Sequence, residues 1–138
     1  MHLKTKIAEY GIILNEKNEF LMLRFAKDEV PSQKWIFPGG RLDDGEEPKL
    51  GLLREITEET NLDIELLNPI DVSMWGIDHD HRYAIFFLCK LVSNPENIKL
   101  SHEHQDYKWY SFDELDNIDY HRKHFKEVLI KVKDQFRS

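Results

Sequence analysis

Apolar residues occur in this chain only in short runs, and that distribution limits the folds open to it. The longest uninterrupted run, AIFFLC at residues 84–89, is far shorter than the roughly 20 residues that a membrane-spanning helix needs. Other β-branched and aromatic runs occupy residues 7–14, 20–25 and 35–37, with turn residues between them. The pattern predicts short strands in a soluble protein, and it predicts that the first two form a hairpin.

The rest of the chain adds strands and two helices. A helix is predicted from Pro48 toward Thr60, because apolar residues recur there at helical spacing, and we expect it to end near Asn61, a residue that tolerates the left-handed conformation. Further elements are predicted as strands at 69–76, 82–92 and 107–110, a loop at 93–106 and a helix at 120–136. Interleaved strands and helices predict an α/β or α+β fold, with helices flanking a mixed sheet. A length of 138 residues predicts one domain, residues 1–138.

Charge and cysteine content restrict the partners and the compartment. The chain has 26 acidic residues against 19 Lys plus Arg and a net charge of −7, which argues against nucleic acid or an anionic membrane as partner. Cys89 is the only cysteine, so an internal disulfide or a CxxC zinc site is excluded, and we expect a buried thiol in a reducing compartment. Residues 1–6 lack the apolar segment of a signal peptide. We therefore expect a cytoplasmic protein.

Three carboxylates in the first predicted helix share one face. Glu55, Glu58 and Glu59 stand at i, i+3 and i+4, and no lysine lies four residues after any of them to relieve their repulsion. A solvated charged face is the alternative, but the last predicted helix shows what such a face looks like, with charges that alternate in sign. Clustered carboxylates are the hard oxygen ligands that Mg²⁺ and Mn²⁺ prefer.

The surrounding residues form a long motif of fixed spacing. From Gly40 the chain reads five residues, Glu46, seven residues, Arg54-Glu55-Ile56, Thr57, Glu58-Glu59, Thr60, Asn61 and Leu62. Residues 40–62 resemble the Nudix box, and the one departure is Asn61, where the family has glycine. Residues 35–40, WIFPGG, are similar to the usual lead-in to that box. The resemblance implies an α/β/α sandwich, in which helices flank the mixed sheet.

The resemblance also implies an activity and a set of site residues. A Mg²⁺- or Mn²⁺-dependent pyrophosphohydrolase would cleave a phosphoanhydride bond in a nucleoside diphosphate linked to another moiety, of the nucleoside triphosphate or nucleotide-sugar type. Glu55, Glu58 and Glu59 match the metal-binding carboxylates, and Gly40 matches the glycine whose carbonyl joins them. Arg54 matches the arginine that orients the glutamates, with an ordinary surface ion pair as the alternative. Glu46 is expected either to organise the entry into the helix or to act as a favourable charge at its N-terminus.

A further glutamate outside the box is expected in this family, and Glu103 is the best candidate. It lies in a segment expected to be a flexible loop, where a carboxylate could reach the metals as ligand and as catalytic base; Asp106 is the second choice and Glu55 the third. Residues 101–109, SHEHQDYKW, are similar to a segment of asymmetrical diadenosine tetraphosphate hydrolases, which makes that activity the alternative. Against it, those enzymes usually have lysine where this chain has Gly39.

Other side chains are weaker candidates. The histidine pairs 79/81 and 102/104 suggest a transition-metal site, although solvated loop histidines are the commoner explanation. The aromatic residues Trp35, Phe37, Trp75 and Tyr83 are candidates for stacking on a base, and Arg24, Arg41 and Arg82 are candidates for binding phosphate. The expected partner is a small nucleotide, with a homodimer left open. A nucleotide-sensing module without catalysis is the alternative from another class, but such a module has no need to keep all three box carboxylates and Arg54.

Overall fold

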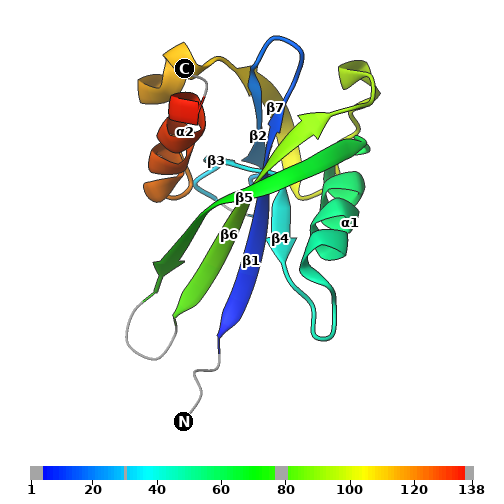
Figure 1. The fold of residues 1–138 in the computed structure, drawn as a ribbon, viewed down its shortest axis with the longest axis vertical. Coiled ribbons are helices and arrows are strands. Elements are labelled where there is room, and N and C mark those ends of the chain that lie inside the picture. Colours follow the sequence, from blue (N-terminus) through cyan, green and yellow to red (C-terminus); the bar gives the residue numbers. More distant parts are fainter. Residues whose placement is uncertain (1–4, 30, 77–80, 136–138) are drawn as a thin grey trace.

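The computed structural model describes residues 5–29, 31–76 and 81–135. A mixed sheet lies between two helices, with α1 on one side and α2 on the other (Figure 1). The strands are β1 (Lys6–Leu14), β2 (Phe20–Phe25), β3 (Trp35–Ile36), β4 (Gly39–Arg41), β5 (Ile64–Trp75), β6 (Arg82–Leu91) and β7 (His104–Tyr110). The helices are α1 (Pro48–Thr60) and α2 (His124–Gln135), with the 3-10 turns η1 (Pro95–Asn97) and η2 (Phe112–Asn117). The predicted α/β/α arrangement is confirmed.

Strand β1 is the centre of the sheet. The strand order is β3-β2-β1-β6-β5, while β4 pairs with β1 and β7 pairs with β2. Pairing between β1 and β6 is parallel over nine positions, from Lys6 opposite Arg82 to Leu14 opposite Lys90. The predicted hairpin of β1 and β2 forms, but it is short, because the rest of β1 pairs with β4 and β6.

Adjacent residues of β1 face the two different helices, as expected for an extended chain. A Cβ atom added to Gly11 would lie 2.9 Å from Cδ1 of Ile56 on α1, so this helix packs closely only because no side chain intervenes. The ring of Tyr10 points to the other side, where it packs edge-on against Phe125 of α2, with 5.6 Å between ring centroids. This alternation decides which side chains of β1 can reach the carboxylates of α1.

Both ends of α1 follow the prediction. Pro48 occupies the first turn, and the side chain of Glu47 caps the helix by accepting a hydrogen bond from the Leu50 amide at 2.9 Å. Asn61 ends the helix in the left-handed conformation, with φ of 61°, and its amide donates to the Thr57 carbonyl. Asparagine therefore serves at the position where the motif has glycine. Within the described residues, no helix is long and apolar enough to cross a membrane.

Several element boundaries differ from the prediction. Strand β5 begins at Ile64 rather than residue 69, because two register shifts against β6 break its alternation. Strand β7 begins at His104 rather than residue 107, since its polar residues face solvent while its backbone pairs with β2. The last helix begins only at His124, and Tyr120 instead forms an isolated bridge with Trp35. Strand β4 and the turn η2 were not predicted.

Cys89 lies in the hydrophobic core and is a free thiol, as predicted. Burial raises the pKa of this thiol to about 12, so it stays protonated at neutral pH. It therefore behaves as a small apolar side chain between the sheet and α1.

Candidate metal centre and active site

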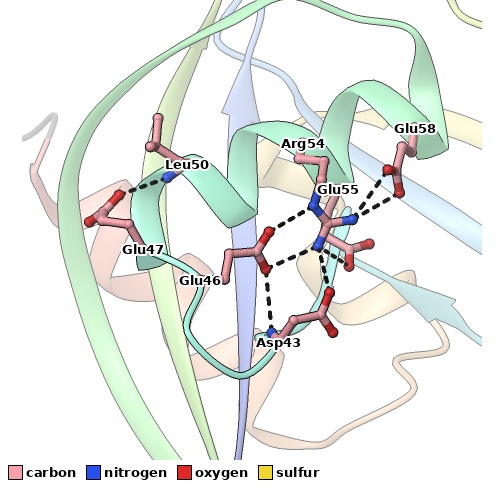
Figure 2. A network of polar contacts seen from close by, with 7 residues as sticks. All are labelled: Asp43, Glu46, Glu47, Leu50, Arg54, Glu55 and Glu58. Atoms are coloured by element: carbon pink, nitrogen blue, oxygen red, sulfur yellow. Dashed lines mark hydrogen bonds and ion pairs between the residues drawn. The ribbon is translucent and has the colours of Figure 1, made fainter.

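Arg54 is the hub of a polar network on the exposed side of α1 (Figure 2). Its Nε and Nη2 atoms donate to the two carboxylate oxygens of Glu46 at 2.8 and 3.0 Å. Its Nη1 atom donates to both oxygens of Glu58 at 3.1 and 3.2 Å, and Nη2 also lies 3.4 Å from oxygens of Glu55 and of Asp43. One guanidinium thus neutralises and orients several carboxylates, which is more than an ordinary surface ion pair does.

Glu46 organises the loop that enters α1. Besides binding Arg54, it accepts a hydrogen bond from the Asp43 amide at 3.3 Å, and the bond from Arg54 holds the pKa of Glu46 below its usual value. Gly51 leaves room for it, because a Cβ atom there would lie 2.8 Å from the Glu46 carboxyl group. The helix cap is Glu47, and the contacts of Glu46 with Arg54 and the Asp43 amide agree with the organising role predicted for it.

Glu59 turns inward and is buried, with 5% of its surface exposed. Its Oε2 atom accepts a hydrogen bond of 2.8 Å from the Gly39 amide at the start of β4. Burial raises the pKa of Glu59 to about 9, more than the Gly39 hydrogen bond lowers it, and the nearby carboxylates of Glu55 and Glu103 raise it further. A side chain in this position is either protonated or held by a cation.

Glu55 lies between these two environments. It is half-buried beside Gly40, where an added Cβ atom would come within 3.0 Å of the Glu55 carboxyl group. Burial is the main cause that raises its pKa, and Arg54 opposes the rise. Because Gly40 has no side chain, the backbone of β4 can approach the carboxylates of α1. This close approach agrees with the role expected of Gly40, which is to offer its carbonyl oxygen to a metal.

The segment before β7 brings two more groups to Glu59. Ligand atoms of Glu59, Glu103 and His104, one from each residue, lie within 4.8 Å of one another. The segment is not a loose loop: the Ser101 amide donates to the Glu59 carbonyl at 3.2 Å, and the Ala26 amide donates to the Glu103 carbonyl at 2.9 Å. Glu103 is thus placed at the carboxylate cluster by backbone hydrogen bonds, which differs from the flexible approach expected from the sequence.

The other candidates of this segment lie elsewhere. Asp106 is exposed on β7, where its side chain accepts a hydrogen bond from the Tyr107 amide at 2.8 Å. His102 is exposed and lies 3.9 Å from Glu29, so it does not accompany His104 into the cluster. His79 is outside the described residues, and His81 precedes β6 and is not in the cluster.

Glu9 is a further candidate for the site that was not predicted from the sequence. It is 2% exposed on β1, directly opposite Gly40, and its Oε2 atom has no hydrogen-bond partner among the described residues. Burial, followed by the charges of Glu46, Glu47 and Glu55, raises its pKa to about 7. The available signal was a single carboxylate within a run of β-branched and aromatic residues.

A cavity of about 290 Å³ opens on the α2 side of the sheet and reaches Gly40. Four cations and several rings surround it; its lining is Lys6, Ala8, Tyr10, Phe25, Ile36, Gly40, Arg41, Trp75, Arg82, His121 and Arg122. The guanidinium of Arg122 lies over the Trp75 ring at 5.2 Å, a cation–π contact. The protein is acidic overall, yet this cavity is locally basic. Of the binding residues predicted from the sequence, Arg41, Arg82 and Trp75 line it.

Four predicted binding residues do not line this cavity. Phe37 is 1% exposed and packs in the core, and Trp35 packs edge-on against Tyr110 at 5.5 Å between ring centroids. The Arg24 Nε atom donates to the Gln33 carbonyl at 3.2 Å. Tyr83 is adjacent to Arg82 in β6 and so faces the α1 side.

The cluster suits a divalent cation by the chemistry of its donors. The cluster consists of Glu59 on α1, Glu103 in the segment before β7 and His104 at the start of β7, with one ligand atom from each within 4.8 Å of the others. His104 Nδ1 is buried and lacks a hydrogen-bond partner within the described part of the chain. A cation bound beside these groups would relieve the repulsion between the carboxylates, and the imidazole offers it a nitrogen ligand.

Comparison with known proteins agrees with this geometry. A family model described as NUDIX domain matches residues 4–131. The asymmetrical bis(5'-nucleosyl)-tetraphosphatase of Caenorhabditis elegans is 33% identical over 97 residues, which is 67% of each chain. The 8-oxo-dGTP diphosphatase of Escherichia coli (strain K12) is 42% identical over 59 residues, 43% of this chain and 45% of the relative. The crystal structure of a MutT protein from Methanosarcina mazei Go1 superposes with a TM-score of 0.83 at 26% identity, covering 100% of this chain and 99% of that one.

The chain belongs to the NUDIX domain family, because the family model covers nearly all of it. It is a hydrolase that acts on phosphoanhydride bonds, as the matched relatives are. The recognition made from residues 40–62 is confirmed.

Proposed function

We propose that this protein is a Mg²⁺- or Mn²⁺-dependent pyrophosphohydrolase whose substrate is a nucleoside diphosphate linked to another moiety. One observation carries the proposal: buried Glu59 lies within 4.8 Å of Glu103, at the end of the sheet where the basic cavity reaches Gly40. Carboxylates able to hold cations and side chains able to hold phosphates thus meet at β4.

Each residue of the cluster has a distinct role in this proposal. Glu55, Glu58, Glu59, Glu103 and the Gly40 carbonyl would hold the cation, which would neutralise phosphate charge and activate water. Glu103 would also accept the proton of the attacking water, since its carboxylate lies beside that of Glu59. Arg54 positions Glu58 through two hydrogen bonds and keeps the helix face folded despite its charge.

The cavity supplies recognition of the nucleotide. The cavity is lined by Arg41 of β4, Arg82 of β6 and Arg122 before α2. Phosphate groups of a nucleotide that extend from Gly40 into the cavity would therefore contact cations from three parts of the chain. The Trp75 ring, on which Arg122 and His124 pack, adds an apolar surface that a base could contact. A nucleoside triphosphate or a nucleotide sugar meets both requirements.

A second candidate substrate is a dinucleoside tetraphosphate. Residues 101–109 resemble the corresponding segment of asymmetrical diadenosine tetraphosphate hydrolases, and the Caenorhabditis elegans relative is named for that activity. Cations from Lys6 to Arg122 could accommodate a longer phosphate chain. Gly39, at the position where those enzymes usually have lysine, favours the first candidate.

A panel of nucleotides tests the proposal. Purified protein is incubated with Mg²⁺ or Mn²⁺ and with nucleoside triphosphates, nucleotide sugars and dinucleoside tetraphosphates, and the products are identified by mass spectrometry. Metal-dependent cleavage of one phosphoanhydride bond, with ¹⁸O from labelled water in one product, supports the proposal and identifies the attacked phosphorus. Tight binding of a nucleotide without turnover of any would instead indicate a nucleotide-sensing module.

We also propose that residues 1–138 form one domain acting in the cytoplasm on a small molecule. The chain has a single cysteine, the buried Cys89, and a chain without a disulfide framework is typical of a reducing compartment. The net charge of −7 disfavours nucleic acid and anionic membranes as partners, whereas a homodimer remains compatible with it. Size-exclusion chromatography with light scattering measures the oligomeric state.

A further inference from the structure

We propose that His104 is a nitrogen ligand of the metal centre and that it makes the centre select transition cations such as Co²⁺ over Mg²⁺. The inference rests on the proposed function only in placing a cation at Glu59. Ligand atoms of Glu59, Glu103 and His104 lie within 4.8 Å of one another, a spacing from which all three can contact one ion. This histidine lies outside the motif at residues 40–62.

The imidazole of His104 is buried, and one of its two nitrogens has no hydrogen-bond partner among the described residues. Only 6% of the residue is exposed, and Nδ1 finds no hydrogen-bond partner in the described part of the chain. A buried donor or acceptor left unpaired is unfavourable, so such a position favours a partner from outside the protein. The carboxylates of Glu59 and Glu103, which have oxygens within 4.8 Å of a nitrogen of this ring, favour a cation as that partner.

The ring is also fixed in place before any ion arrives. His104 begins β7 opposite Phe25 of β2, and the two rings stack with 5.4 Å between centroids and 27° between planes. The His104 amide donates to the Ser101 carbonyl at 3.3 Å, which ties the residue to the segment anchored on α1. A ligand held by packing and backbone bonds loses little freedom when it binds an ion.

Ligand chemistry then predicts selectivity. Carboxylates and water suit Mg²⁺, whereas imidazole suits cobalt, zinc and similar ions, whose affinity for nitrogen ligands exceeds that of Mg²⁺. A centre of carboxylates alone would show less preference for Co²⁺. Adding one imidazole to Glu59 and Glu103 shifts the preference toward Co²⁺.

His102 provides a matched control two residues away. Its side chain is 83% exposed and its Nε2 atom lies 3.9 Å from Glu29, outside the cluster. Replacing it removes the same chemical group from the same segment. Any effect specific to the metal centre should therefore appear in His104→Gln and not in His102→Gln.

The test measures metal binding by the full chain in the absence of nucleotide. Dissociation constants for Co²⁺ and Mg²⁺ are obtained by calorimetry for the wild type, His104→Gln and His102→Gln, and visible absorption of the Co²⁺ forms is recorded. We expect His104→Gln to lower the preference for Co²⁺ over Mg²⁺ by about tenfold or more and to alter the Co²⁺ spectrum, with His102→Gln unchanged. An unchanged preference and spectrum in His104→Gln would overturn the proposal.

A second measurement keeps the inference testable should His104→Gln fail to fold. In wild-type protein labelled with ¹⁵N histidine, Zn²⁺ should shift one imidazole nitrogen of a buried histidine strongly, and Mg²⁺ should not. Assignment of that signal to His102 or to another histidine would contradict the proposal. Both measurements are independent of turnover, so loss of hydrolysis in the nucleotide panel would refute the proposed function without touching this result.

Discussion

Glu59→Gln should stabilise the protein in the absence of metal, although it removes a residue of the candidate site. The carboxyl group has a pKa of about 9 in the folded protein, against a usual value of 4.5. At pH 7 the unfolded chain has lost this proton and the folded chain keeps it, so folding carries a penalty of about 1.36 kcal/mol for each of the 2.5 units between 4.5 and 7, or about 3 kcal/mol. Glutamine carries no charge and can still accept the Gly39 hydrogen bond.

The sign of the pH dependence follows from the raised pKa. Stability linked to a raised carboxyl pKa is fully present below pH 4.5 and is lost as pH rises toward 9. Wild-type protein in EDTA should therefore lose stability over that window more steeply than Glu59→Gln. At pH 7 the variant should be more stable by about 1–3 kcal/mol, the lower values applying where the site relaxes around the charge.

Urea unfolding in EDTA at several pH values measures both effects. Glu58→Gln is the matched control, because its side chain is 59% exposed and paired with Arg54, and its stability should stay within about 0.5 kcal/mol of wild type. Adding Mn²⁺ should stabilise the wild type and not Glu59→Gln. Parallel pH profiles for wild type and Glu59→Gln would refute the argument that a buried carboxyl group is held at this position for a cation.

Four substitutions, at Glu58, Glu103, Asp106 and Glu9, test other parts of the site. Glu58→Gln should lower turnover of the active nucleotide at least about a hundredfold while the protein stays folded, since the side chain loses a metal-binding charge; near wild-type turnover would remove Glu58 from the centre. Glu103→Gln should lower kcat by about ten- to a thousandfold with little change in KM. Asp106→Asn should lower kcat less, because the Asp106 side chain is exposed and accepts a hydrogen bond from the Tyr107 amide. A larger effect of Asp106→Asn would assign the role of base to Asp106. Glu9→Gln should raise the free energy of unfolding at pH 8 by about 1–3 kcal/mol and should not raise it at pH 4. The reason is that the raised pKa of Glu9, about 7, lowers the stability of the wild type only as pH rises from 4.5 to 7. Equal gains at both pH values would contradict this.

Local signals in the sequence were sufficient for α1 and its ends. Proline in the first turn, carboxylates at helical spacing and a terminal asparagine are decided by residues next to one another in the chain, and the structure confirms the helix. The strands β5 and β7 were shortened in the prediction for a different reason. Bulges and solvent-facing polar residues remove the alternation on which strand prediction depends, while pairing with β6 or β2 still fixes the backbone.

Spacing also could not tell the three box carboxylates apart. A helical face places Glu55, Glu58 and Glu59 together, yet only Glu59 is buried and only Glu58 is exposed and bound twice by Arg54. The difference comes from the segment before β7, which covers one edge of α1 from more than 40 residues away in the chain. Long-range covering of this kind leaves no local trace, and for the same reason buried Glu9 was not identified.

The alternation of β1 explains how an acidic chain can have a basic cavity next to a carboxylate cluster. Lys6, Ala8 and Tyr10 line the cavity on the α2 side, whereas Glu9 and Gly11 face α1. Strand β4, paired with β1, brings Gly40 to the boundary, so that its backbone borders the cavity and also approaches Glu55. A phosphate chain lying across Gly40 would have cations on one side and the carboxylate-held metal on the other, an arrangement in which attraction arises from local charge and not from net charge. Removing a cavity cation such as Arg82 should therefore weaken nucleotide binding while metal binding at Glu59 is retained, which separates the two halves of the site experimentally.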